Sequence, residues 1–146
     1  MTDAVLVQAG LAERIKAGFA ATAIEIVAVF DQTPPNSTIQ TVEDCAALGQ
    51  EQGCNLIIGL GGGSVLDTAK VANILMVKGG PAQDHMGAYL LGQTALLPLF
   101  LIPTTAGTGS EVTKVAASAG PDHDVKSPFA ETQFLPDLAI LDPELT

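Results

Sequence analysis

The sequence contains little cysteine and little positive charge. Two cysteines, Cys45 and Cys54, occur in 146 residues. Their spacing matches no metal-binding knuckle, so we expect both to be reduced residues that serve packing. Six basic residues against sixteen acidic ones give a net charge of −10, which excludes the basic face that a nucleic-acid-binding protein needs. The excess of acid predicts a well-solvated surface and does not identify a partner.

Long apolar runs are absent too. The stretches LPLFLI at 97–102 and LAIL at 138–141 fall far below the roughly 20 residues of a membrane-spanning helix. The start, MTDAV, lacks the basic and apolar regions of a targeting segment. We therefore expect no membrane partner and a cytoplasmic location. A hydrophobic content of 47% and a mean hydropathy of +0.37 exclude a disordered chain, and the length suits one domain.

Histidine is equally scarce. His85 and His123 are the two imidazoles of the sequence, and neither has a histidine or carboxylate partner one helical turn away. No serine or cysteine lies in a nucleophile elbow beside a histidine. We therefore expect neither a metal site nor a catalytic residue within these 146 residues.

Two glycine-rich turns stand out against this background. Residues 61–64 (GGGS) follow the apolar run 54–60, and residues 106–110 (AGTGS) follow the run 97–102. Each turn precedes a helix-like segment. Glycines let backbone N–H groups approach a phosphate, and a helix N-terminus adds partial positive charge. Two such turns predict neighbouring strand ends that line one nucleotide-binding crevice.

The hydrophobic periodicity predicts an alternation of helices and strands. We expect helices over 4–22, 38–52 and 64–78, and strands over 24–31, 54–60, 97–102, 114–118 and 138–141, with a loop over 81–95 and a polar, turn-rich stretch over 119–128. This order indicates an α/β fold with a Rossmann-like, doubly wound, mainly parallel sheet. Residues 1–146 would form one nucleotide-binding domain. Both of its ends look incomplete, because no strand precedes the first helix and the sequence stops just after the last strand.

Several polar residues of these turns also have a structural interpretation. Ser64 could cap the following helix, with Asp67 as the first-turn carboxylate, and this is compatible with a phosphate contact. Lys70 is expected to be solvated or ion-paired, and Ser110 could be an ordinary N-cap. Capping does not explain the clustered hydroxyls and glycines of the second turn, and this cluster favours a ligand site at a strand end. Its members are Thr104, Thr105, Gly107, Thr108 and Gly109.

At these turns the chain resembles the iron-containing (group III) alcohol dehydrogenases. GGGSVLDTAK at 61–70 is similar to one signature of that family, and PTTAGTGSEVT at 103–113 to a second. FLPDLAILDPELT at 134–146 resembles its stretch ending in D-P-x-L. PPNST at 34–38 departs from the usual P-N-P-T by Ser37 in place of proline. The resemblance covers essentially the whole chain.

The resemblance implies roles for residues at matching positions. Asp3 would bind the adenosine ribose, and a carboxylate there favours NAD over NADP because it repels a 2′-phosphate. Asn36 would line the adenine side, and Asp67 would lie near the nicotinamide end. The other implied cofactor-binding residues are Gly62, Gly63 and Ser64 at the pyrophosphate, Thr104, Thr105, Thr108, Ser110 and Thr113 on the second turn, Lys126 near the nicotinamide ribose, and Leu145.

The departures from the family pattern limit the expected activity. The family's Fe²⁺ ligands belong to an all-helical second domain, and no D-x-x-x-H occurs in residues 1–146. The resemblance therefore implies the cofactor half of an NAD-dependent alcohol dehydrogenase, lacking its first strand and its metal domain and inactive alone. Two alternatives stay open: a non-catalytic nucleotide-binding or interaction module, and a truncated fragment without independent function. The sequence does not determine the substrate, and transhydrogenase and maleylacetate reductase activities also occur in this family. It does not determine whether the chain forms a homo-oligomer.

Overall fold

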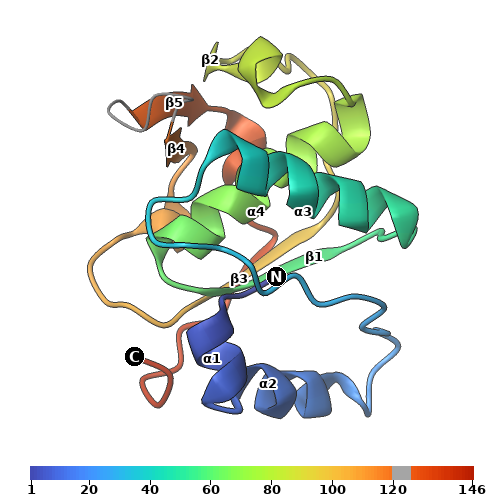
Figure 1. The fold of residues 1–146 in the computed structure, drawn as a ribbon, viewed down its shortest axis with the longest axis vertical. Coiled ribbons are helices and arrows are strands. Elements are labelled where there is room, and N and C mark those ends of the chain that lie inside the picture. The colour runs from blue at the N-terminus through green and yellow to red at the C-terminus, as the bar shows by residue number, and fades with distance from the viewer. Residues whose placement is uncertain (120–125) are drawn as a thin grey trace.

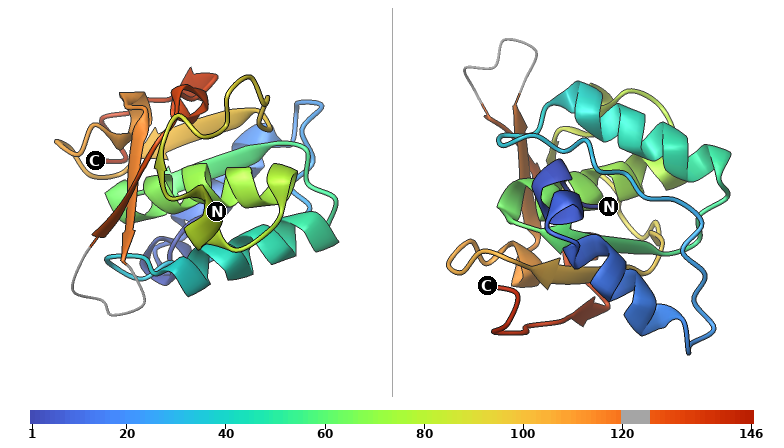
Figure 2. Two further views of the ribbon diagram at one scale, coloured as in Figure 1. Left: turned by 90° about the horizontal axis from the view of Figure 1, so that it is seen from above. Right: turned by 60° about the horizontal axis from the view of Figure 1, so that its bottom comes forward.

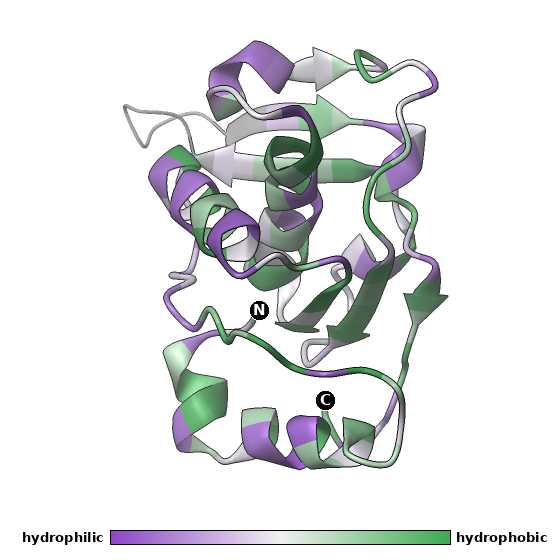
Figure 3. Ribbon diagram, turned by 90° about the vertical axis from the view of Figure 1, so that its right-hand side faces the viewer, coloured by the Kyte–Doolittle hydropathy of each residue, from purple (hydrophilic) through white to green (hydrophobic). Residues whose placement is uncertain are grey.

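A parallel sheet forms the centre of the molecule. The computed structural model describes residues 1–119 and 126–146, and gives only the backbone of residues 119, 126 and 127. The sheet has the order β1-β3-β6, and both pairings are parallel. Its strands are β1 (Ile57–Gly61), β3 (Leu99–Pro103) and β6 (Leu138–Ala139). The α/β fold with a parallel sheet is therefore confirmed, and Figure 3 shows hydrophobic colour concentrated on these strands.

Helices cover both faces of this sheet because its strands are apolar on both sides. Ile57 and Leu101 pack with Leu66 of α4 on one face, whereas Leu60 and Ile102 pack on the other face. Figures 1 and 2 show α3 and α4 on one side of β1 and β3, with α1 and α2 on the opposite side. The helices are α1 (Ala4–Gln8), α2 (Leu11–Phe19), α3 (Ile39–Glu51) and α4 (Gly63–Lys78).

A second three-stranded sheet packs beside α4. It has the order β2-β5-β4, in which β5 runs parallel to β2 and antiparallel to β4. Its strands are β2 (Gly87–Ala88), β4 (Val115–Ala119) and β5 (Lys126–Ala130). Single 3₁₀ turns join these elements: η1 (Ala82–His85), η2 (Ser110–Val112) and η3 (Thr132–Phe134). The prediction of a strand over 114–118 is confirmed, but β5 begins inside the stretch 119–128 that the sequence predicted as turn-rich, and residues 120–125 lie outside the described part.

The first predicted helix is interrupted. A single helix over 4–22 is wrong because Gly10 adopts a left-handed conformation with φ of 76° and ends α1. Glycine tolerates this conformation without a Cβ clash, so it separates α1 from α2 at little cost. The second helix then ends at Phe19, three residues before the predicted end.

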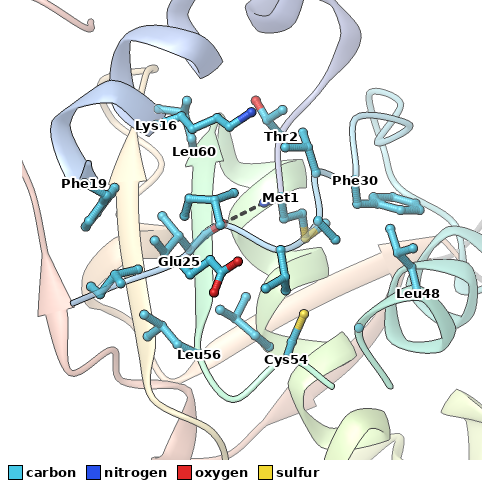
Figure 4. A pocket seen from close by; sticks show the side chains of 18 of the residues that line it. Met1, Thr2, Lys16, Phe19, Glu25, Phe30, Leu48, Cys54, Leu56 and Leu60 are labelled. Atoms are coloured by element: carbon cyan, nitrogen blue, oxygen red, sulfur yellow. Dashed lines mark hydrogen bonds between the residues drawn. The ribbon is translucent and has the colours of Figure 1, made fainter. Parts of the chain in front are cut away.

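The predicted strand over 24–31 is also wrong. The segment keeps a strand-like alternation, and Val27 and Val29 are 47% and 43% exposed. Within the described residues it meets the start of the chain at its carboxyl end, where the Thr2 N–H donates to the Phe30 C=O at 2.8 Å. The rest of the segment is separated from β1 by a groove of about 430 Å³. This groove is lined mainly by apolar side chains (Figure 4). Strand propensity does not form a strand without a neighbour to supply hydrogen bonds.

Candidate functional site

The polar loops of the chain gather where the parallel strands end. Met1 lies beside β1, since its N–H₃⁺ donates to Ile58 C=O at 2.8 Å and its C=O accepts from Leu60 N–H at 3.0 Å. This is the pattern of parallel strands, so the following Asp3 lies near the carboxyl end of β1. On the other side of β1, Gly61 is level with Pro103 of β3. Ligands of open α/β sheets bind at this edge.

The two glycine turns face each other across this edge. A Cβ on Gly62 would lie 3.2 Å from the Thr105 Oγ1, and one on Gly63 would lie 3.3 Å from Thr108 Cγ2 and 3.4 Å from the Ser110 Oγ. A side chain at either glycine would therefore press against the second turn, so glycine lets the two turns lie in close contact. The structure thus brings the two turns together, as the sequence predicted. A cavity of about 270 Å³ adjoins the second turn, between residues 103–107 and 141–146.

The first turn presents a helix N-terminus. Gly62 is the N-cap of α4, and no side chain caps this helix. The interpretation of Ser64 as the capping residue is therefore wrong. Its hydroxyl instead accepts a hydrogen bond from the Asn36 N–H at 3.1 Å. An N-terminus without a side-chain cap, on a helix of 16 residues, suits an anion because its first N–H groups and its dipole favour negative charge.

The loop that carries Asn36 is fastened to α4 by a buried contact. The Thr68 hydroxyl lies 2.5 Å from the Ser37 hydroxyl and 2.7 Å from the Ser64 C=O. Thr68 is fully buried and Ser37 is 1% exposed. Two predicted site residues, Asn36 and Ser64, are thereby held side by side. The sequence analysis missed Thr68, although a hydroxyl within an apolar helix face was the signal that could have found it.

Asp3 caps a helix in addition to its predicted role in binding the ribose. Its Oδ1 accepts a hydrogen bond from the Leu6 N–H at 2.9 Å and so caps α1. The residue is partly buried. A carboxylate at an N-cap can keep this bond while its second oxygen accepts from a ligand.

Lys70 was expected to be solvated or ion-paired, and because it is fully buried beside Asp67 only the solvated alternative is wrong. Its Nζ donates to the C=O groups of Thr113 and Val115 at 2.9 and 3.0 Å, and to the Thr113 Oγ1 at 3.3 Å. The Asp67 Oδ1 lies 4.0 Å from this Nζ, and the Asp67 Oδ2 accepts from the Ala117 N–H at 3.1 Å. Burial lowers the pKa of the Lys70 ammonium, and the carboxylates of Asp67 and Glu111 act against that decrease.

The remaining predicted residues occupy different environments. Thr104 is half-buried, Thr105 and Thr108 are exposed, and Ser110 is buried. Gly109, with φ of 66°, precedes the 3₁₀ turn at Ser110, so Ser110 is not the N-cap that the structural interpretation assumed.

The last two predicted site residues are Leu145 and Lys126. Leu145 packs with Leu60 and Ile102 below the strand ends. The Lys126 backbone opens β5 opposite Ala119. Its side chain, like the whole of His123, lies outside what the structure describes.

A metal site is not found in the described part of the chain. No group of three or more His, Cys, Asp or Glu residues there could hold a metal ion. Cys45 and Cys54 are both free, and Cys45 is buried as expected. None of the described helices is long and apolar enough to cross a membrane.

Comparison with known proteins identifies the family. The model of the family "Iron-containing alcohol dehydrogenase" matches residues 1–143. The chain is 40% identical over 151 residues to 4-hydroxybutyrate dehydrogenase of Cupriavidus necator, covering all of this chain and 38% of that protein. It is 32% identical over 145 residues to NAD-dependent methanol dehydrogenase of Bacillus methanolicus, covering 99% of this chain and 38% of that protein.

A solved structure agrees with these relatives. The sulfoacetaldehyde reductase of Bifidobacterium kashiwanohense, crystallised in complex with NAD⁺, superposes with a TM-score of 0.84 at 33% identity, over 99% of this chain and 38% of that one. The chain thus spans between a third and two fifths of the length of these relatives. It belongs to the iron-containing alcohol dehydrogenase family.

Proposed function

We propose that residues 1–146 are a nucleotide-binding domain, the NAD-binding part of a dehydrogenase that transfers hydride between NAD and a small alcohol, aldehyde or ketone. One observation carries the proposal: the N-terminus of α4 has no side-chain cap, and its glycines Gly62 and Gly63 lie close against the hydroxyls of Thr105 and Ser110. Backbone N–H groups, partial positive charge and hydroxyl donors together suit a pyrophosphate.

The adenosine side of NAD would extend from this helix N-terminus toward Asp3. The Asp3 carboxylate would accept hydrogen bonds from the ribose hydroxyls while it continues to cap α1. It would repel a 2′-phosphate, so NAD is preferred over NADP. Asn36 would line the adenine side, since the Ser64 contact holds it beside the first turn.

The nicotinamide side would lie toward the second turn. Asp67 and Thr113 meet around Lys70 there, and Thr104, Thr108, Lys126 and Leu145 complete the proposed contacts. When bound, the nicotinamide supplies the position that gives or accepts hydride. The residues of this chain would orient the ring and hold it at the edge of the sheet.

Iron and substrate would bind in the part of the relatives that this chain does not span, as the family resemblance implies. The described residues do not fit an Fe²⁺ site, so no reaction step is assigned to iron here. The matched relatives act on methanol, 4-hydroxybutyrate and sulfoacetaldehyde by their names, and a small alcohol or carbonyl compound is the proposed substrate class of a complete protein.

Calorimetric titration of the chain with NAD and with NADP tests the proposal. We expect saturable NAD binding with weaker NADP binding. Gly62→Asp should abolish NAD binding, because its side chain would press against Thr105 at the N-terminus of α4 and its charge would repel the pyrophosphate. Gly18→Asp is the matched control, since a Cβ on Gly18 meets nothing within 4 Å. Asp3→Asn should bring NAD and NADP affinities together while it retains a capping oxygen.

Circular dichroism of each protein separates the alternatives. Folded wild-type chain that does not bind NAD, or that binds it equally after Gly62→Asp, contradicts the proposal and leaves an interaction module of another kind. A chain that does not fold alone contradicts it as well, and supports a fragment without independent function.

A further inference from the structure

The buried ammonium of Lys70 joins α4 to the segment that leads from the second glycine turn into β4. Its three protons face three oxygens, the C=O groups of Thr113 and Val115 and the Thr113 hydroxyl, all within 3.3 Å. A residue that is fully buried and carries a charge is costly unless such partners surround it. The contact is therefore a specific feature of this site and not a property of a helix surface.

Asp67 extends the same contact along the strand. It lies one helical turn before Lys70 and accepts from the Ala117 N–H at 3.1 Å. Residues 113, 115 and 117 alternate along the chain, so their backbone groups face the same edge of β4. The opposite edge pairs with β5. The side chains of Lys70 and Asp67 thus take the place that a neighbouring strand would have on this edge.

We infer that Lys70 is a positioning residue for the nicotinamide side of the cofactor. This inference rests on the proposed function, which places Asp67 and Thr113 on that side. Lys70 orients the Thr113 hydroxyl as an acceptor and fixes its backbone, and it stands 4.0 Å from the Asp67 carboxylate. Without the ammonium, two C=O groups lose their donor, and the segment from Thr113 to Ala117 keeps the Asp67 hydrogen bond at Ala117 but is no longer fixed to α4 at Thr113 and Val115.

The inference predicts a selective effect on ligands. ADP shares the adenosine and the pyrophosphate with NAD but lacks the nicotinamide ribose. The Asp3, Gly62 and Asn36 contacts that would hold the shared part do not involve Lys70. Loss of Lys70 should therefore weaken NAD binding and leave ADP binding almost unchanged.

Titration of Lys70→Met with NAD and with ADP tests this. Methionine keeps the length of the side chain and removes its charge and donors. We expect about a tenfold loss of NAD affinity, the size of one net hydrogen bond, and an ADP affinity within about twofold of wild type. Lys78→Met is the matched control: Lys78 is the exposed last residue of α4, and its loss should change neither affinity.

Equal losses of NAD and ADP affinity, or an unchanged NAD affinity in folded Lys70→Met, would overturn the inference while the proposed function stands. If Lys70→Met does not fold, Lys70→Arg replaces it, because arginine keeps the charge but its planar guanidinium cannot match the three oxygens. Lys70→Arg should then weaken NAD binding and leave ADP binding almost unchanged. Equal losses of NAD and ADP affinity in this variant would again contradict the inference. Wild-type chain that binds neither ligand overturns both the inference and the proposed function.

Discussion

At the scale of residues, the sequence predicts best those features whose chemistry is local. Gly62 and Gly63 form a glycine turn before a helix, and the structure places this turn in close contact with the second glycine turn. The burial of Lys70 was not predicted, because a lysine in a helix gives no local sign of what lies opposite it. Its partners, Thr113 and Val115, are more than forty residues away.

A buried thiol gives a prediction at the residue scale. Cys45 is 8% exposed, and burial raises the pKa of its thiol from 9.0 to about 11. Between these values the unfolded chain loses a proton that the folded chain keeps, so the free energy of unfolding should fall as the pH rises. The shift corresponds to about 2.7 kcal/mol.

The comparison with Cys45→Ala isolates this thiol, because other groups that titrate above pH 9 are common to both proteins. The stability advantage of wild type over Cys45→Ala, measured by urea denaturation, should shrink by about 2–3 kcal/mol between pH 8.5 and 11. An advantage that stays constant over this range would show that Cys45 ionises equally in both states.

At the scale of elements, the sequence predicted α3, α4 and the parallel strands because their apolar patterns match the periods of helix and strand. The prediction failed over 24–31, where β-branched residues have strand propensity but the described residues meet the segment in a backbone hydrogen bond at its carboxyl end, from Thr2 to Phe30. The second sheet was also not predicted. The pairing of β5 with β2 and β4 depends on tertiary structure, and a short polar stretch of sequence does not predict it.

Asn73 provides a prediction about how α4 is joined to the segment that leads into β3. Its Nδ2 donates to the Leu97 C=O at 2.8 Å and its Oδ1 accepts from the Leu97 N–H at 3.0 Å, in a fully buried position. Asn73→Leu should lower the free energy of unfolding by about 2–4 kcal/mol, because both Leu97 groups lose their partner.

Urea denaturation of Asn73→Leu beside Asn55→Leu measures this effect. Asn55 is exposed, so the same substitution there should change the stability by less than about 0.5 kcal/mol. Equal effects of the two substitutions would show that the Leu97 contact does not hold β3 in place.

At the scale of the whole molecule, the account depends on one edge of the sheet. The starts of the loops at Asp3, Gly62 and Thr104 meet there because Met1, β1 and β3 run in the same direction. The family assignment agrees with this arrangement. The groove beside residues 24–30 is the larger cavity of the two, but it is lined mainly by apolar side chains and lies away from both glycine turns.

The position of bound NAD is therefore the most direct test. In ¹⁵N–¹H NMR spectra of the chain, addition of NAD should shift the amide signals of Asp3, Gly62, Gly63, Ser64 and Thr105, and those of residues 24–30 should change little. Shifts confined to residues 24–30 and β1, or no shifts in a folded chain, would contradict the assignment of this edge as the cofactor site.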